Sequence, residues 1–209
     1  MYNQRLVALY KRLLPNWGEM ILAELEGAET ILDLGCGPCS IVGQRKSGRA
    51  YGVDIHEPYL AHAQRYHTHD LYVQGDILNL RCLPKSFDVV LLSEVLEHLD
   101  KAHGLLLLAM AEEWARHKVV VKVPNGYVPQ RAFDGNPYQE HRSAWTLGEL
   151  QSLGYTVTGA SGWKVLRGTE GKVKLWPYWI GDRISDVTQL AVRRRPRLAF
   201  QLFAVKSLA

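Results

Sequence analysis

The residues best suited to chemistry lie in one stretch, 31–40, which reads I-L-D-L-G-C-G-P-C-S. It begins with an apolar run typical of a buried parallel strand, and Gly35 and Gly37 follow in a turn. Glycine lets backbone come close to a ligand, because it has no side chain and tolerates left-handed dihedral angles. The stretch therefore predicts a strand that ends in a ligand-binding turn. It matches only the first half of the dinucleotide fingerprint G-x-G-x-x-G, since Ser40 replaces the third glycine.

An acid further along the chain adds to this prediction. Residues 51–55 read Y-G-V-D-I and predict a second strand that ends at Asp54, about twenty residues after the turn. In a doubly wound sheet, an acid at this spacing binds the hydroxyl groups of a ribose. Together, the turn and Asp54 predict a site for a cofactor that contains a ribose. The simpler alternative is an ordinary strand and turn followed by an incidental acid.

Strand-like and helix-like segments alternate along the chain, which argues for a parallel sheet. The expected strands cover residues 31–34, 51–55, 71–73, 87–92, 118–123, 155–158 and 199–205. The expected helices cover residues 6–14, 17–25, 57–66, 104–116, 147–153 and 184–194. Thr146 and Glu149 have the spacing of a capping box, and Gly43 and Gly48 leave room for only a short helix after the glycine turn.

A length of 209 residues suits one domain with a substantial core. We expect a single domain over 1–209, with helices in 1–27 as a cap over the sheet edge or the cofactor mouth, and with 163–197 inserted before the last strand. No apolar run approaches the roughly 20 residues of a membrane span, and the N-terminus lacks the apolar region of a signal peptide. We therefore expect a soluble, cytoplasmic protein.

Two compositional features leave functional alternatives open. Residues 163–209 carry a net charge of +7, including Arg193, Arg194, Arg195 and Arg197, whereas residues 1–162 carry −3. The basic segment could face an anionic substrate or nucleic acid, although a solvated helix face is the commoner cause of such a run. The three cysteines are too few for a disulfide framework, and the C-x-x-C pair at 36–39 lacks the second pair of a metal site.

Four segments occur in the order and at the spacings of the class I S-adenosylmethionine-dependent methyltransferases, particularly the type-11 group. They are D-L-G-C-G-P from Asp33, G-V-D-I from Gly52, G-D-I at 75–77, and F-D-V-V-L-L-S-E-V-L-E-H-L from Phe87. The chain resembles this family over nearly its whole length. The resemblance implies an α/β fold, a doubly wound Rossmann-like sheet of seven strands, mostly parallel, whose antiparallel last strand is inserted beside the fifth. Cys39 departs from the pattern, since many relatives have glycine there.

The resemblance also implies S-adenosylmethionine as cofactor and a small-molecule acceptor. Asp54 would accept hydrogen bonds from both ribose hydroxyls, and Asp76 from the adenine amino group. Asp33 would orient the turn or, through water, the ammonium group of the methionine part. The expected cofactor contacts are Asp33, Gly35, Cys36, Gly37, Asp54, Ile55, Asp76, Ile77 and Ser93. For Asp76 and Ser93 the simpler alternatives are a turn former and a helix cap.

Residues 125–145 follow the fifth predicted strand, so they should emerge at the same edge of the sheet as the glycine turn. The segment mixes turn formers with aromatic residues, as a lid over an acceptor would. We expect His141 to be the catalytic residue facing the transferable methyl group, with acceptor contacts from Asn125, Tyr127, Tyr138 and Trp145. The alternative is a structural loop whose aromatic residues fill a small core. His98 is expected to be a structural residue.

Two other functions are compatible with the sequence. Glu94, Glu97 and His98 reproduce the E-x-x-E-H of metal-dependent small-RNA 2′-O-methyltransferases, with His141 as a possible fourth ligand. The same letters occur in small-molecule methyltransferases that bind no metal, so we predict no metal, and we expect neither a nucleic-acid partner nor a membrane. The second alternative is a binding or scaffolding subunit that has lost catalysis, which the complete set of cofactor residues argues against.

Overall fold

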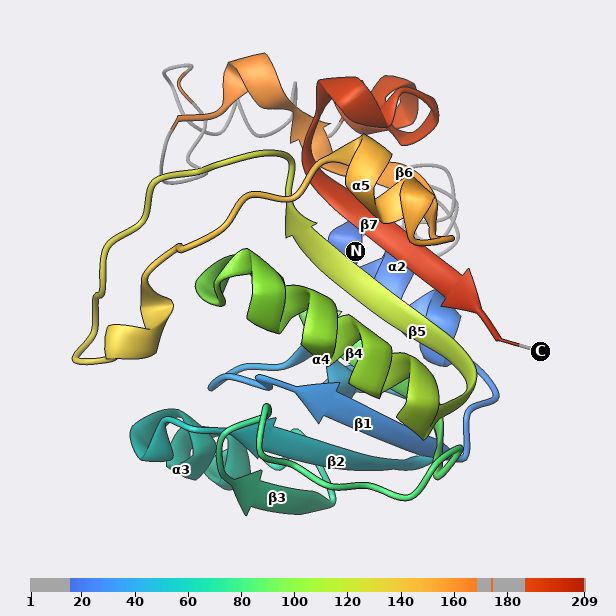
Figure 1. Cartoon of the computed structure of the whole chain (residues 1–209), viewed down its shortest axis with the longest axis vertical. Helices are drawn as coiled ribbons and strands as arrows, with labels where there is room; N and C mark the ends of the chain where they lie inside the picture. Colours follow the sequence, from blue (N-terminus) through green and yellow to red (C-terminus); the bar gives the residue numbers. More distant parts are fainter. Residues whose placement is uncertain (1–15, 169–173, 175–186, 209) are drawn as a thin grey trace, which may run out of the picture.

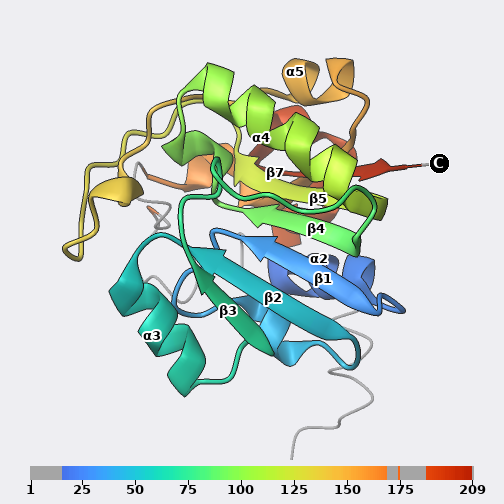
Figure 2. The same ribbon diagram turned by 60° about the horizontal axis from the view of Figure 1, so that its bottom comes forward.

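A computed structural model describes residues 16–168, 174 and 187–208, and these form one mixed sheet flanked by helices on both faces (Figures 1 and 2). The strand order is β3-β2-β1-β4-β5-β7-β6. Strand β7 is antiparallel to β5 and β6, whereas the other pairs are parallel. The strands are β1 (Thr30–Leu34), β2 (Arg49–Asp54), β3 (Leu71–Gln74), β4 (Phe87–Ser93), β5 (Ala115–Pro124), β6 (Thr156–Trp163) and β7 (Ala199–Ser207). The predicted sheet, with its antiparallel last strand beside the fifth, is confirmed.

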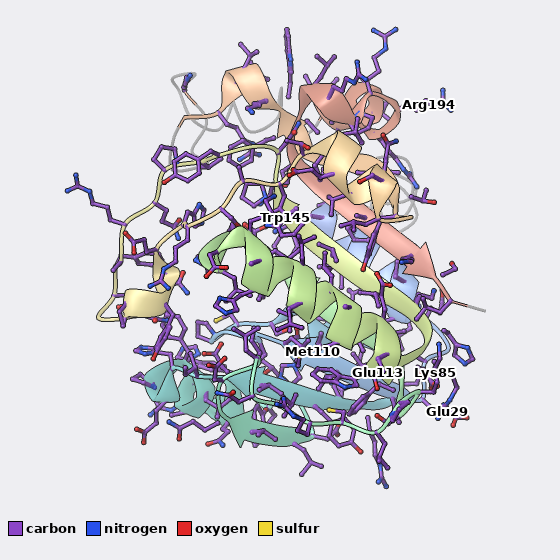
Figure 3. The ribbon with its side chains drawn as sticks, in the orientation of Figure 1. Glu29, Lys85, Met110, Glu113, Trp145 and Arg194 are labelled. Carbon is purple, nitrogen blue, oxygen red and sulfur yellow. The ribbon has the colours of Figure 1, made fainter. Side chains whose placement is uncertain are left out.

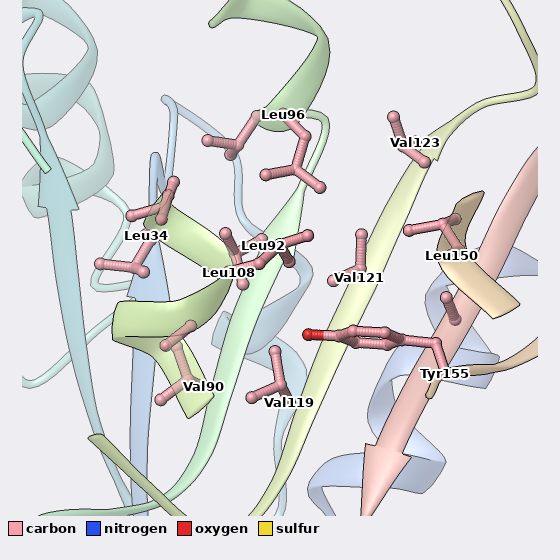
Figure 4. Packing of buried hydrophobic residues seen from close by; sticks show 14 of the residues in the cluster. Leu34, Val90, Leu92, Leu96, Leu108, Val119, Val121, Val123, Leu150 and Tyr155 are labelled. Atoms are coloured by element: carbon pink, nitrogen blue, oxygen red, sulfur yellow. The ribbon is translucent and has the colours of Figure 1, made fainter. Parts of the chain in front are cut away.

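The central strands bury apolar side chains on both faces, as the sequence predicted for residues 87–92. In β4, Val90 and Leu92 face one apolar cluster, while Val89 and Leu91 face the other. Figure 4 shows the first cluster between the sheet and α4 (Lys101–Trp114). Burial on both faces keeps β4 and its neighbour β1 in the middle of the sheet, so the residues at their carboxyl ends have a rigid support.

The helices begin where the sequence offers capping side chains. Thr146 and Glu149 form the predicted capping box at α5 (Leu147–Ser152), and Asn16 and Glu19 form another at α2 (Trp17–Leu25). Helix α4 begins at Lys101, three residues before the predicted start, because the Asp100 side chain accepts a hydrogen bond from the His103 N–H. Helix α3 spans Glu57–Arg65, and a short 3-10 turn, Ile41–Gln44, follows the glycine turn.

The N-terminal segment was expected to cover the sheet edge or the cofactor mouth. Helix α2 instead packs on a face of the sheet, where Met20, Ile21 and Leu25 join the second apolar cluster. The expected helix over 6–14 and the first part of the one over 184–194 lie outside the described residues, whereas residues 187–194 are helical. None of the helices in the described part of the chain is long and apolar enough to span a membrane.

Candidate active site

A cavity of about 710 Å³ opens at the carboxyl ends of β1, β2 and β4. This is where open α/β sheets bind ligands, because loops leave neighbouring strands there in opposite directions. All nine residues predicted to contact the cofactor line this one cavity: Asp33, Gly35, Cys36, Gly37, Asp54, Ile55, Asp76, Ile77 and Ser93. They come from four separate segments of the chain, so the fold brings together what the sequence spaced apart.

The glycine turn adopts backbone angles that favour glycine at both predicted positions. Gly35 has φ +67° and Gly37 has φ +59°. A Cβ on Gly35 would lie 2.7 Å from Val95 Cγ2, whereas a Cβ on Gly37 would meet nothing within 4 Å. Gly35 is therefore required by the protein's own packing, while Gly37 faces open space. Space beside Gly37 lets a ligand approach the backbone of the turn.

Asp54 is fixed by the turn it faces. The Gly37 N–H donates to Asp54 Oδ2 at 2.8 Å, and the His56 N–H donates to Oδ1 at 2.8 Å. The carboxylate is buried, at 8% exposure. Two charge-assisted hydrogen bonds hold it in one orientation, which suits a group that must accept two ribose hydroxyls in fixed geometry.

Asp76 and Asp33 also have partners within the protein. Asp76 Oδ1 accepts from the Leu78 N–H at 2.9 Å, so the carboxylate is the turn former that the sequence left as an alternative, and it lines the cavity as well. Asp33 Oδ2 accepts from the Ser40 hydroxyl at 2.6 Å and contacts His69 Nε2 at 3.0 Å. Cys36 lies between these acids, and burial, followed by the charges of Asp33 and Asp54, raises the pKa of its thiol. Cys36 is therefore a neutral thiol at neutral pH, and Cys36 and Cys39 do not form a disulfide.

The residues predicted to contact the acceptor are more scattered. Tyr138 lines the cavity, but Asn125, Tyr127 and Trp145 do not belong to its lining. The Asn125 amide donates to backbone carbonyls of residues 196, 197 and 199. Trp145 is fully buried beside the first turns of α4, where Gly104 makes room for its ring (Figure 3). Two of these residues thus hold the loop in place, as the structural alternative expected.

The loop nevertheless reaches the cavity through its middle part. Phe133, Asp134, Asn136, Gln139 and Arg142 contribute to the lining. Figure 1 shows this segment passing over the carboxyl edge of the sheet toward α3. Burial and the neighbouring Asp134 carboxylate raise the pKa of Tyr59, which lies on α3 and also lines the cavity. The part of the predicted lid that meets the cavity is therefore the segment 133–142.

The two histidines of the site are placed differently from the prediction. His141 is buried and outside the cavity lining, and its Nδ1 lies 2.6 Å from the Val128 carbonyl oxygen. His98, expected to be structural, lines the cavity, and its Nδ1 lies 3.2 Å from the Glu140 carbonyl oxygen. Since a carbonyl only accepts, each Nδ1 carries a proton and donates, which leaves Nε2 of a neutral ring as an acceptor. Burial and the adjacent His141 lower the pKa of His98 to about 4.

The E-x-x-E-H segment is divided by the fold. Potential ligand atoms of Glu97, His98 and His141 lie within 4.8 Å of one another. Both carboxylate oxygens of Glu97 are buried without a hydrogen-bond partner in the described part of the chain, and burial, followed by the Glu94 charge, raises its pKa well above the usual range. Glu94 has φ +58°, and its Oε1 accepts from Lys122 at 2.8 Å and from Gln201 at 2.9 Å. Three of the four proposed ligands meet, and the fourth is engaged elsewhere.

Sequence reasoning missed several residues that line the cavity, among them Trp17, His98, Phe133 and Arg142. Trp17 is the first residue of α2, which follows the Asn16 capping box, and the distance along the chain gave no sign that it reaches the cavity. His98 had a usable signal, since it follows directly on the fourth strand, whose carboxyl end belongs to the site. Arg142 lies next to the residue that was chosen.

The comparisons with known proteins agree with this geometry. Residues 32–116 match the family model of a methyltransferase domain of the type-11 group. The chain carries a type-11 methyltransferase domain. That match, together with the fold, assigns the chain to the S-adenosylmethionine-dependent methyltransferases of class I. No curated protein matches the chain.

Solved structures with the same fold include several methyltransferases. One is a SAM-dependent methyltransferase from Archaeoglobus fulgidus, with a TM-score of 0.57 and 18% identity over 97% of this chain and 99% of that one. Another is the 1,6-didemethyltoxoflavin-N1-methyltransferase of Burkholderia thailandensis, solved with its substrate and S-adenosylhomocysteine (0.58; 19%; 98% and 81%). A third is the methyltransferase domain of a bacterial Hen1 (0.56; 21%; 95% and 98%). At these identities the likeness shows the fold and does not identify the acceptor.

Proposed function

We propose that this methyltransferase binds S-adenosylmethionine in the cavity at the carboxyl ends of β1, β2 and β4 and transfers its methyl group to a small-molecule acceptor. The observation that carries the proposal is the convergence of all nine cofactor residues predicted from the sequence on that cavity. Its volume of about 710 Å³ lies within the range of small-molecule sites, about 300 to 1,000 Å³. We also propose that the described elements belong to one domain, because one sheet runs through all of them.

In this proposal each end of the cofactor has a protein partner. Asp54, held by the N–H groups of Gly37 and His56, accepts the ribose hydroxyls. Asp76 and Ile77 bind the adenine ring, and the turn at Gly35 to Gly37, with Asp33, binds the methionine part. When bound, S-adenosylmethionine supplies an activated methyl group on a positively charged sulfur. The protein's tasks are to align the acceptor with that group and to exclude water.

On the acceptor side, we place His98 rather than His141 next to the reacting groups, because His98 lines the cavity and His141 lies behind it. Their ring centroids are 4.8 Å apart, in an edge-to-face arrangement. A neutral His98 with its Nδ1 proton held by the Glu140 carbonyl offers Nε2 to accept a proton from a hydroxyl or amine. Phe133 and Tyr138 supply apolar walls, and Arg142 supplies a positive charge.

Calorimetry with S-adenosylhomocysteine tests the cofactor site without knowledge of the acceptor. Replacing Asp54 by Ala should weaken binding by about 1.5 to 3 kcal/mol, the range for hydrogen bonds to a charged group. Glu57→Ala is the matched control, since Glu57 is an exposed acid three residues further on and outside the cavity lining. Equal affinity of wild type and Asp54→Ala would refute the ribose assignment.

A labelled methyl donor tests the activity and searches for the acceptor. The protein is incubated with the donor and a cell extract, and the labelled product is identified by mass spectrometry. Label on a small molecule supports the proposal, whereas label on RNA supports the second function described below. Cofactor binding without transfer to any component would favour the scaffolding alternative.

A metal-dependent RNA 2′-O-methyltransferase remains the second candidate, and one observation favours it. Burying a carboxylate without a partner is costly, and a cation beside Glu97, His98 and His141 would remove that cost. Both histidines have the Nδ1–H···O=C contact that orients metal-binding imidazoles. Against it, Glu94 is paired with Lys122, and a neutral, protonated Glu97 accounts for the same burial.

Metal titration separates the two candidates. The first proposal expects that protein treated with chelator binds no Mn²⁺, Co²⁺ or Zn²⁺ at these residues and keeps its methyl transfer. Under the second, calorimetry would show one tight site that Glu97→Gln or His141→Ala abolishes. His103→Ala is the control, because His103 lines the same cavity but lies outside the cluster.

A further inference from the structure

His69 and Asp33 form a buried pair beneath the cofactor cavity. His69 lies between α3 and β3, and its Nε2 is 3.0 Å from Asp33 Oδ2 at the carboxyl end of β1. The two side chains are 0% and 3% exposed. Since an ionised carboxylate only accepts hydrogen bonds, Nε2 carries a proton and donates. A buried carboxylate needs such a donor, because leaving it without a partner is strongly destabilising.

The surroundings of the imidazole hold it in one position. Thr68 Oγ1 lies 2.9 Å from the other ring nitrogen, Nδ1. The Tyr72 ring packs edge-to-face at 5.6 Å, and its hydroxyl accepts from the His69 N–H at 2.8 Å. Gly52 on β2 makes room for the ring, since a Cβ there would lie 2.9 Å from His69 Cγ and Nδ1. The imidazole is therefore fixed from three elements before any ligand binds.

Asp33 connects this histidine to the glycine turn. Ser40, which follows the turn, donates its hydroxyl to the same Oδ2 at 2.6 Å and also accepts from the Val42 N–H at 3.2 Å. Two donors on one oxygen, from opposite sides of the chain, give the carboxylate a single orientation. The direction of Oδ1, and the path of the chain from residue 33 to residue 40, are set by the same contacts.

We propose that His69 is a positioning residue for cofactor binding: it fixes Asp33, and through Asp33 and Ser40 the glycine turn, in the conformation that accepts the methionine part of the cofactor. The inference rests on the proposed function. It predicts that losing the Nε2 donor lowers cofactor affinity more than it lowers fold stability. His69 itself does not line the cavity, so its effect must pass through Asp33.

The test compares binding of S-adenosylhomocysteine by calorimetry in wild type, His69→Leu and His69→Gln, with thermal unfolding of each protein. His69→Leu should weaken binding at least about tenfold, as expected for one lost hydrogen bond to a charged group. Glutamine places its amide nitrogen where the ring has Nε2, so His69→Gln should restore binding to within about threefold of wild type. Tyr72→Phe is the control, because it removes two hydrogen bonds next to the same histidine and leaves Asp33 untouched.

A double-mutant cycle distinguishes positioning from general loss of packing. In an Asp33→Ala background, His69→Leu should weaken binding by less than about twofold, because the intermediary is absent. The inference is overturned if His69→Leu binds like wild type, if His69→Gln binds as weakly as His69→Leu, or if the effect persists without Asp33. Wild type that does not bind S-adenosylhomocysteine would refute the proposed function itself.

If His69→Leu fails to fold, nitrogen-15 NMR of histidine-labelled wild type gives the same answer. The Nε2 resonance of His69, identified by its loss in His69→Gln, should shift when S-adenosylhomocysteine binds, because the ligand changes the charge environment of Asp33. A resonance that stays in place at saturation would overturn the inference.

Discussion

The two halves of the cavity are held in place by different means. On the cofactor side, Asp33, Asp54 and Ser93 stand at the ends of strands β1, β2 and β4, which lie within the hydrogen-bonded sheet. On the acceptor side, Phe133, Tyr138 and Arg142 stand on a loop and are exposed to solvent. The cofactor half is fixed by the sheet, whereas the acceptor half depends on the anchors at the two ends of its loop.

That difference matches the demands of the proposed chemistry. The cofactor is the same for every member of the class, so its site can be part of the fold. Acceptors differ between members, and a loop can change its side chains without disturbing the sheet. The following predictions test whether the two halves can be damaged separately, in order of decreasing effect.

Trp145→Ala should cause the largest loss of stability, about 3 to 5 kcal/mol, because a fully buried aromatic ring leaves a cavity. The ring packs on Gly104 and lies under Lys101 Nζ, which is 3.8 Å from its centroid. Urea unfolding measures the change. Tyr127→Ala, on the same loop but 57% exposed, is the control. Equal stability of both variants would show that the loop is not anchored through Trp145.

Alanine at the two glycines of the turn should separate packing from binding. Gly35→Ala combines a left-handed backbone with a contact of 2.7 Å to Val95, so we expect a loss of about 2 to 4 kcal/mol of stability. Gly37→Ala meets open space, so it should cost about 1 to 2 kcal/mol of stability from strain alone. Its methyl group enters the ligand's space, so its main effect should be on S-adenosylhomocysteine affinity. The reverse order would contradict the assigned roles.

Asp88→Asn should weaken the sheet while sparing the cavity, since Asp88 lies at the amino end of β4. Burial raises the pKa of Asp88, but hydrogen bonds from the Glu29 and Thr30 N–H groups, together with Arg116, outweigh burial and lower it. We expect a loss of about 1.5 to 3 kcal/mol at neutral pH.

The pH dependence has a definite sign. A lowered pKa in the folded protein means that the stabilisation is fully present above the usual aspartate pKa and is lost as the pH falls through the folded-state pKa. Unfolding of Asp88→Asn and wild type should therefore converge at acidic pH. A difference that does not change with pH would argue against a charged Asp88.

Tyr138→Ala should have the smallest effect on stability, within about 0.5 kcal/mol, because the side chain is 48% exposed. Affinity for S-adenosylhomocysteine should also stay unchanged. Once an acceptor is known, its KM should rise, because Tyr138 belongs to the loop half of the cavity. Loss of cofactor affinity in this variant would show that the two halves are not independent.

The same difference explains what the sequence could and could not predict. The strands and the glycine turn follow from local patterns, and the residues at strand ends are brought together by the topology of a parallel sheet. Asp54 could therefore be assigned by spacing alone. The anchors of a loop carry no such pattern: Trp145 has the composition of a ligand contact, and only its packing on Gly104 places it in the core.

His98 and His141 show the second limit. Both histidines follow plausible signals, and residue type does not tell which one meets the cavity. Backbone contacts at Val128 and Glu140 decide it, and these belong to the tertiary structure. The same holds for His69, which needed a partner 36 residues away before it had any visible function.

The position of β7 between β5 and β6 has a consequence for how the protein folds. The strand that fills the gap is the last of the seven along the chain, so β5 and β6 stay without their shared partner until residues 199–207 have been synthesised. Until then both strands present open edges, which are sites for aggregation. Completion of the sheet is a late and non-local step, and a ribosome-bound chain that ends before residue 199 should depend on chaperones for its solubility.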